Sequence, residues 1–329
     1  MRRTVATLVI AAAVTAGACG SGDDDSASST TSARRDARPT TTTAPAPTVP
    51  AAPLTFSRVT KTFVDRSRAT EDPDDTRSAS TRTLVTDVYV PAGRGPFPLI
   101  VHSHGASGHP RKFTQLASAW ARHGYVVVLP AFPLSNDRSG GSVVIGDYVN
   151  QADDVHFVID EVLKLASEDG NELSGKVDAD HIGVSGLSLG GATTYGVAFN
   201  ECCRDERIDA TIIMSGIRLP FGDEPFDLSL MPVMIMHGTA DTTVGYSNAE
   251  APYADAAAPK YLVTLIGAPH ALAYEDAPDA HDEVVIETTT DFWDAYLRGD
   301  DAAKAQLLED ANVPGLSSIR SDVGERREN

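Results

Sequence analysis

Apolar and polar residues change their pattern at about Leu54 of the 329-residue chain. Beyond it, short apolar runs alternate with longer stretches that carry apolar residues at helical spacing. The middle runs are continuously apolar, as expected of strands buried on both faces. The strands predicted in this way are 56–64, 82–90, 97–104, 125–131, 181–186, 208–216, 232–238 and 260–267.

Four segments between and after these strands have the period of an amphipathic helix. They are 112–124, 147–167, a segment that begins directly after Ser188, and 283–299. Strands alternating with helices predict an α/β fold, in which a mostly parallel sheet has helices on both faces. We see no internal repeat and no boundary of a second domain, so residues 54–300 are predicted to form one domain.

The N-terminus has the charge pattern of an export signal. Arg2 and Arg3 precede the apolar run 8–18, which is too short to span a membrane. The run ends at Cys19 after small residues, and this arrangement resembles a bacterial lipoprotein signal, in which the cysteine becomes the lipidated first residue. Residues 1–19 are therefore interpreted as a lipoprotein signal and the protein as anchored at the cell surface. The alternative is a secreted protein cut near Ala18.

Residues 20–53 are rich in Ser, Thr, Pro and Ala and contain no large apolar side chain with which to build a core. Such a segment cannot bury enough surface to offset the entropy of ordering it, so we expect a disordered tether. At the other end, residues 301–329 are polar and are expected to form a peripheral tail, with one possible short helix at 302–311.

A formal net charge of −19 argues against a nucleic-acid partner, because phosphate binding needs a basic surface and the sequence shows no basic cluster. Besides Cys19 the chain has only the adjacent pair Cys202 and Cys203, for which a disulfide and two buried free thiols both remain open. Adjacent thiols without a second ligand pair lack the spacing of a zinc site. We expect no metal and no cofactor, and the sequence carries no signal for an oligomeric state.

The segment "SGLSLGG" places Ser188 between a predicted buried strand and a predicted helix. Gly186 and Gly190 flank the serine at two positions on either side, as a tight turn that exposes a nucleophile requires. A purely structural connection between a strand and a helix would have the same pattern of glycines. The residues downstream decide between these interpretations, because a serine hydroxyl needs a base and the base needs an acid.

Both partners follow in the loops after later strands. Asp241 follows strand 232–238 and His270 follows strand 260–267, and the ends of parallel strands meet at one edge of a sheet. The order serine, aspartate, histidine is the order expected on such a sheet. Asp223 is the rival acid and His281 the rival base. His237 is expected to support the loop of the acid.

The turn after strand 97–104 completes the predicted site. His104, Gly105 and Ala106 place the backbone N–H of Ala106 near the serine, and the N–H of Leu189 follows the serine directly. These two groups are predicted to form the oxyanion hole. Phe132, Leu134 and Leu187, together with Leu189, are candidate walls of a substrate pocket, although they serve equally well as ordinary core.

The segments 98–133, 178–193, 202–216 and 233–244 resemble the α/β-hydrolase superfamily, and within it bacterial relatives of platelet-activating-factor acetylhydrolase, chlorophyllases and dienelactone hydrolases. The likeness extends from about Leu84 to Leu297. It implies hydrolysis of carboxylic esters, with Ser188, Asp241 and His270 as the triad. Segment 217–231 is short, so a minimal lid is expected.

The residues on either side of Ser188 limit what the resemblance implies. Cutinases and polyester hydrolases usually have an aromatic or histidine before the serine and a methionine after it, whereas this chain has Leu187 and Leu189. The prediction is a serine esterase that acts on a small-molecule or lipid-like ester. Polyester hydrolase, thioesterase and peptidase are alternatives on the same triad. A catalytically silent surface-binding lipoprotein is the alternative from another class.

Overall fold

The computed structural model describes residues 48–324 of the chain. The predicted signal at 1–19, including Cys19, and nearly all of the predicted tether lie outside these residues. Within residues 48–324, no helix is both long enough and apolar enough to cross a membrane.

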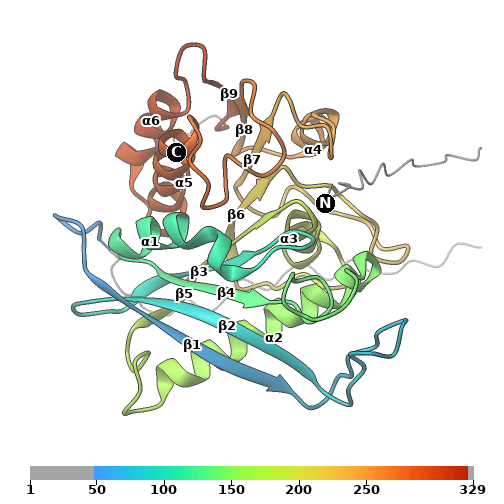
Figure 1. The fold of residues 1–329 in the computed structure, drawn as a ribbon. Helices are drawn as coiled ribbons and strands as arrows, with labels where there is room; N and C mark the ends of the chain where they lie inside the picture. Colours follow the sequence, from blue (N-terminus) through green and yellow to red (C-terminus); the bar gives the residue numbers. More distant parts are fainter. Residues whose placement is uncertain (1–47, 325–329) are drawn as a thin grey trace, which may run out of the picture. The chain divides into compact units, whose positions relative to one another are not determined.

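A sheet of nine strands runs through the described part of the chain (Figure 1). Its spatial order is β1-β2-β4-β3-β5-β6-β7-β8-β9, with parallel pairing from β4 to β8 and antiparallel pairing at both ends. The strands are β1 (Phe56–Asp65), β2 (Arg82–Pro91), β3 (Phe97–Ser103), β4 (Val126–Ala131), β5 (Val177–Leu187), β6 (Ile208–Met214), β7 (Val233–Gly238), β8 (Lys260–Leu265) and β9 (Ser317–Asp322).

Helices cover both faces of this sheet, as predicted for the α/β-hydrolase fold (Figure 1). They are α1 (Thr114–Arg122), α2 (Tyr148–Ser167), α3 (Leu189–Phe199), α4 (Ser247–Asp255), α5 (Asp282–Leu297) and α6 (Asp301–Asp310), with 3-10 turns at η1 (Pro110–Phe113) and η2 (Ile145–Asp147). Side chains of α2, α3 and α4 pack in one apolar cluster, and those of α1, α5 and α6 pack in a second one. The two clusters contain alternate residues of the same strands, so they lie on opposite faces of the sheet.

The continuously apolar runs became the central strands because helices cover them on both sides. Every residue of β3, β4 and β7 is buried, whereas the edge strand β1 alternates between exposed and covered positions. Helix α1 turns Leu116, Ala117, Trp120 and Ala121 into the core. The following Gly124 has φ +85°, a conformation that favours glycine at the end of a helix.

Two elements were absent from the sequence prediction, and both lie toward one edge of the sheet. Helix α4 contains Pro252 and has little apolar periodicity. Strand β9 is polar, yet it pairs with β8 over Lys260 to Leu265. The segment 301–329, expected as a peripheral tail, thus supplies α6 and an edge strand, so its residues 301–322 pack as part of the fold. An edge strand buries little surface, which is why its sequence lacks an apolar signature.

Candidate active site

Ser188 lies in the turn between β5 and α3 with φ 57° and ψ −115°, a conformation that a residue with a side chain rarely adopts. The glycines around it are required by close backbone contacts. A Cβ on Gly186 would lie 2.2 Å from the carbonyl oxygen of Gly190, and one on Gly190 would lie 2.1 Å from that of Ser103. The turn is therefore the constrained elbow that exposes a serine, and the glycines at this spacing have a steric cause.

The structure brings the three predicted triad residues into one hydrogen-bonded row. His270 Nε2 lies 2.8 Å from the hydroxyl oxygen of Ser188, and His270 Nδ1 lies 2.7 Å from Oδ2 of Asp241. A carboxylate only accepts hydrogen bonds, so Nδ1 carries the ring hydrogen and Nε2 is free to accept the hydroxyl of Ser188. This is the arrangement in which an imidazole acts as a base toward a serine.

Four donors surround the carboxylate of Asp241, whose side chain has no exposed surface. Oδ1 accepts the backbone N–H groups of Thr243 and Val244, both at 2.9 Å. Oδ2 accepts from His270 and lies 3.2 Å from Nε2 of His237. Burial alone raises the pKa of Asp241, but the hydrogen bonds from the two histidines and from Val244 outweigh it and hold this pKa well below its usual value. Asp241 is therefore ionised at neutral pH.

His237 supports this acid, as the sequence suggested. Its Nε2 lies 2.8 Å from the carbonyl oxygen of Val244 and 3.2 Å from Asp241 Oδ2, and both of these atoms are acceptors. Nε2 consequently carries a hydrogen that both atoms attract. The ring ties the acid to the loop that follows it.

The rival residues are placed elsewhere. Asp223 is an exposed residue of the turn before Glu224. His281 is buried, with Nδ1 at 2.5 Å from Asp279 and Nε2 at 3.0 Å from the carbonyl oxygen of Ile266. Neither residue has a hydrogen bond to Ser188 or His270 within the described part of the chain.

The turn after β3 lies against Ser188. A Cβ on Gly105 would be 3.1 Å from the Cβ of Ser188. The Gly105 carbonyl accepts from Nδ1 of His104 at 2.7 Å and from the N–H of Gly108 at 2.9 Å. Because the peptide is trans, its carbonyl and the N–H of Ala106 point in opposite directions, so these two bonds also fix the direction of that N–H.

His104 is held as a neutral ring with one defined tautomer. Its Nε2 accepts the N–H of Phe132 at 3.1 Å, which leaves the hydrogen on Nδ1. Burial lowers the pKa of His104 to about 4. Among the hydrogen bonds of residues 48–324, none uses the N–H of Ala106 or of Leu189. These two N–H groups therefore remain the candidates for an oxyanion hole.

The predicted pocket walls are core residues. Phe132 and Leu134 have no exposed surface and Leu187 has 2%. The ring of Phe132 packs on His104 at 5.1 Å between centroids. Between the two interpretations of these apolar residues the structure favours the core, because Phe132 and Leu187 pack in the two apolar clusters and all three side chains are buried.

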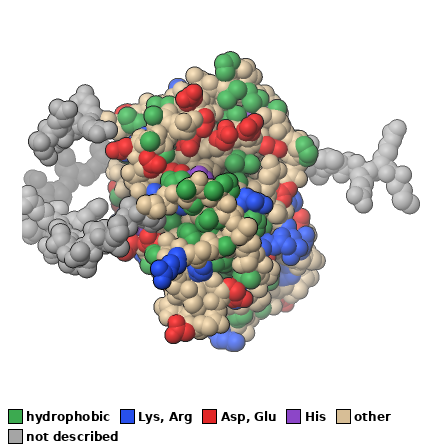
Figure 2. Space-filling model, turned by 90° about the vertical axis from the view of Figure 1, so that its left-hand side faces the viewer, with side chains coloured by type: hydrophobic (Ala, Val, Ile, Leu, Met, Phe, Trp, Pro, Cys, Tyr) green, Lys and Arg blue, Asp and Glu red, His purple; other side chains and the backbone are tan. Residues whose placement is uncertain are grey.

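Leu272 was missed by sequence reasoning and is the better candidate for a substrate contact. It follows His270 by two residues and is 48% exposed. The sequence did contain a signal for it, because Leu272 is a large apolar residue in the loop that contains His270. Figure 2 shows a face of the molecule on which hydrophobic side chains gather around a hollow that contains a histidine, with acidic side chains above it.

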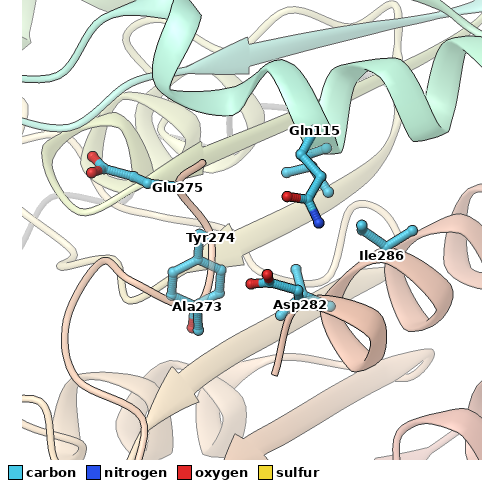
Figure 3. Close-up of a pocket in the computed structure, with 8 residues that line it drawn as sticks. Gln115, Ala273, Tyr274, Glu275, Asp282 and Ile286 are labelled. Carbon is cyan, nitrogen blue, oxygen red and sulfur yellow. The ribbon is translucent and has the colours of Figure 1, made fainter. Parts of the chain in front are cut away.

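Charged side chains join the loops around the site. Lys112 donates to the carbonyl oxygen of Ser107 at 2.8 Å, and its ammonium lies 3.8 Å from the carboxylates of Asp137 and Glu275. Asp276 accepts two N–H groups at the start of α1. A small, shallow depression lies next to this contact, between α1 and α5, and is lined in part by Gln115, Tyr274 and Ile286 (Figure 3). No triad residue lines that depression.

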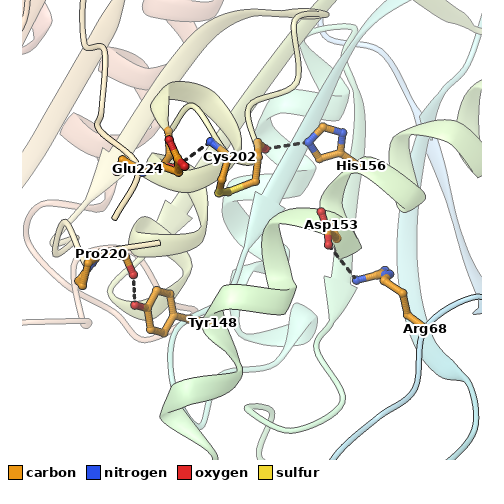
Figure 4. The surroundings of a disulfide bond; sticks show 9 residues. Arg68, Tyr148, Asp153, His156, Cys202, Pro220 and Glu224 are labelled. Atoms are coloured by element: carbon orange, nitrogen blue, oxygen red, sulfur yellow. Dashed lines mark hydrogen bonds and ion pairs between the residues drawn. A yellow bond between two sulfur atoms is a disulfide. The ribbon is translucent and has the colours of Figure 1, made fainter. Parts of the chain in front are cut away.

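Cys202 and Cys203 form a disulfide bond with each other (Figure 4). The pair follows the C-terminal end of α3, whereas Ser188 precedes the N-terminal end of the same helix. His156 of α2 binds the carbonyl oxygen of Cys203 at 2.8 Å. Within residues 48–324, no group of His, Cys, Asp and Glu side chains has the arrangement of a metal site.

Comparison with known families finds a match to one part of the chain. Residues 81–220 match the family model described as X-Pro dipeptidyl-peptidase (S15 family), a serine hydrolase family of the α/β-hydrolase superfamily. The match covers less than half of the chain. It includes Ser188 but ends before Asp241 and His270. No curated protein matches the chain. The fold is that of the α/β-hydrolases, and the matched segment indicates a serine hydrolase.

Proposed function

We propose that this serine hydrolase cleaves carboxylic esters through an acyl-enzyme intermediate. The observation that carries the proposal is the pair of hydrogen bonds of His270, at 2.8 Å to Ser188 and at 2.7 Å to Asp241. The sequence resemblance to bacterial esterases related to platelet-activating-factor acetylhydrolase supports an ester as the substrate. A silent binding protein would have no need of an elbow strained at Ser188 and a charged acid buried behind the base.

In the proposed reaction, the hydroxyl of Ser188 attacks the ester carbonyl while His270 Nε2 takes its proton. Asp241 holds the imidazole in the required tautomer and stabilises its positive charge. The N–H groups of Ala106 and Leu189 stabilise the oxyanion of the tetrahedral intermediate. His270 then donates the proton to the leaving alcohol, and a water molecule attacks the acyl-enzyme by the same steps in reverse order.

The alternative acyl substrates share this mechanism, and one of them has a specific observation in its favour. The family matched by residues 81–220 is described as an X-Pro dipeptidyl-peptidase, so an amide bond after proline is the second candidate substrate. Thioesters and polyesters are further candidates. The connection between β6 and β7 spans only residues 215–232, and this favours an open site with a minimal lid.

The deciding experiment measures kcat/KM of the purified domain on nitrophenyl esters of graded chain length, an X-Pro nitroanilide and a thioester. We expect the esters to be preferred by more than a hundredfold over the nitroanilide. A preference for the nitroanilide would establish the peptidase instead. Activity that persists in Ser188→Ala would show that another protein in the preparation is responsible.

We further propose that the enzyme is exported and anchored to a membrane through lipid on Cys19. A disulfide between Cys202 and Cys203 supports export, since such bonds persist in oxidising compartments. The segment 20–53 would then hold the catalytic domain away from the bilayer.

A further inference from the structure

Three polar side chains without exposed surface meet between α2, α3 and the loop after β4. They are Gln151, Ser135 and Thr193. None of them belongs to the triad or to the predicted oxyanion hole. Buried polar groups cost stability unless they are hydrogen-bonded, so a set of three side chains at this place calls for a role.

Gln151 uses both ends of its amide in this cluster. Its Nε2 donates to the hydroxyl oxygen of Ser135 at 2.9 Å, and its Oε1 accepts the hydroxyl of Thr193 at 2.6 Å. The amide therefore joins the loop after β4 to α3.

Each partner is attached to one of the two segments that flank the nucleophile. The carbonyl oxygen of Ser135 accepts the N–H of Ser107, at 2.8 Å, and Ser107 directly follows Ala106. Thr193 lies one helical turn after Leu189, and its hydroxyl oxygen is 3.2 Å from the Leu189 carbonyl oxygen. A short chain of contacts thus leads from Ala106 through Gln151 to Leu189.

From this arrangement we propose that Gln151 is a positioning residue that sets the separation of the two N–H groups of the oxyanion hole. The inference rests on the proposed function, which assigns those groups to the oxyanion. Donors in an oxyanion hole must lie within about 2.7–3.1 Å of the oxygen that becomes charged. Without firm support from neighbouring side chains, donor groups drift from this distance. A misplacement of about 1 Å is enough to lower the rate about a hundredfold.

The test replaces Gln151 with methionine, which has a similar length but neither donor nor acceptor of comparable strength. Removal of a whole oxyanion donor costs about 10²–10³ in kcat, so displacement of the donors should cost less, roughly ten- to a hundredfold. We expect that loss in kcat for a nitrophenyl ester, with KM nearly unchanged. An aryl trifluoromethyl ketone, whose adduct with serine places an oxyanion in the hole, should bind more weakly by the same factor.

His156→Met is the matched control on the same helix. His156 binds Cys203 rather than the site, so this variant should lower the melting temperature and leave kcat per folded molecule unchanged. Circular dichroism measures the folded fraction in both cases. Thr193→Val removes one contact of Gln151 and serves where Gln151→Met does not fold. The double variant should be no slower than Gln151→Met alone, since both changes break the same connection.

Three results would overturn the inference. One is a kcat of folded Gln151→Met within twofold of wild type. Another is a lower kcat with unchanged affinity for the trifluoromethyl ketone, because the effect would then lie in the triad. Additive losses in the double variant are the third. A wild-type protein that neither hydrolyses esters nor reacts with a fluorophosphonate would refute the proposed function itself, which is a separate outcome.

Discussion

Replacement of Asp241 by asparagine tests the proposed triad at the side chain whose hydrogen bonds the structure defines in most detail. Oδ1 accepts two backbone N–H groups, so the amide oxygen of asparagine must take that position. The amide NH₂ then occupies the position of Oδ2 and faces His270 Nδ1 at about the 2.7 Å of the present contact. Two donors cannot share a hydrogen bond, and the imidazole must therefore move its hydrogen to Nε2.

An imidazole with its hydrogen on Nε2 donates to Ser188 and cannot take the hydroxyl proton. In comparable triads this wrong tautomer lowers kcat by about 10⁴, which corresponds to about 5.5 kcal/mol of transition-state stabilisation. We expect a loss of this size in Asp241→Asn, measured as kcat on a short-chain nitrophenyl ester, with KM within a few-fold of wild type. The volume of the side chain is unchanged, so the protein should remain folded by circular dichroism.

Asp223→Asn is the control, because Asp223 has the same charge but lies in an exposed turn. It should retain wild-type activity within a factor of two. The reasoning would be refuted if folded Asp241→Asn kept more than a tenth of wild-type kcat. A large loss in Asp223→Asn alone would show that the acid follows β6 rather than β7.

Three further predictions concern the nucleophile, the elbow and the anchor. Ser188→Ala should abolish fluorophosphonate labelling and lower kcat by up to about a millionfold without unfolding, and labelling that persists would exclude Ser188 as the nucleophile. Gly190→Ala places a Cβ 2.1 Å from the Ser103 carbonyl oxygen and should lower the free energy of unfolding in urea by about 1–3 kcal/mol or more, whereas Gly146→Ala meets no atom within 4 Å and should be nearly neutral; equal effects would contradict the steric argument. Cys19→Ser should move the protein from the membrane fraction to the medium, or leave an uncleaved precursor, with unchanged specific activity of the folded domain; wild-type protein that is wholly soluble and begins at another residue would indicate secretion.

Part of the arrangement of the site could be predicted from the order of residues along the chain. Parallel strands end at the same edge, so three residues in the loops after β5, β7 and β8 were expected to be neighbours, and the hydrogen bonds of His270 join them. The prediction needed only the topology and the order of the residues. The glycines around Ser188 were equally readable, because their requirement is local and steric.

The sequence left open or missed features whose local pattern has more than one tertiary outcome. Apolar residues near a strand end either line a pocket or fill the core, and the choice depends on which way the next segment turns. Phe132 turned inward onto His104, whereas Leu272 remained exposed beside the base. Strand β9 was missed because a polar edge strand acquires its structure from pairing with β8 and not from its own sequence.

By itself, the sequence determined the alternation of elements, the tight turn at Ser188 and the order of the proposed triad, since each depends on residues close together or on the direction of the chain. Only the tertiary structure decided the tautomer of His104, the four donors around Asp241 and the connection through Gln151. The physical reason is that a hydrogen bond depends on distances of tenths of an ångström between side chains far apart in sequence. Gln151 and Thr193 are 42 residues apart, and their contact is set by the packing of α2 on α3, which periodicity within either helix does not encode.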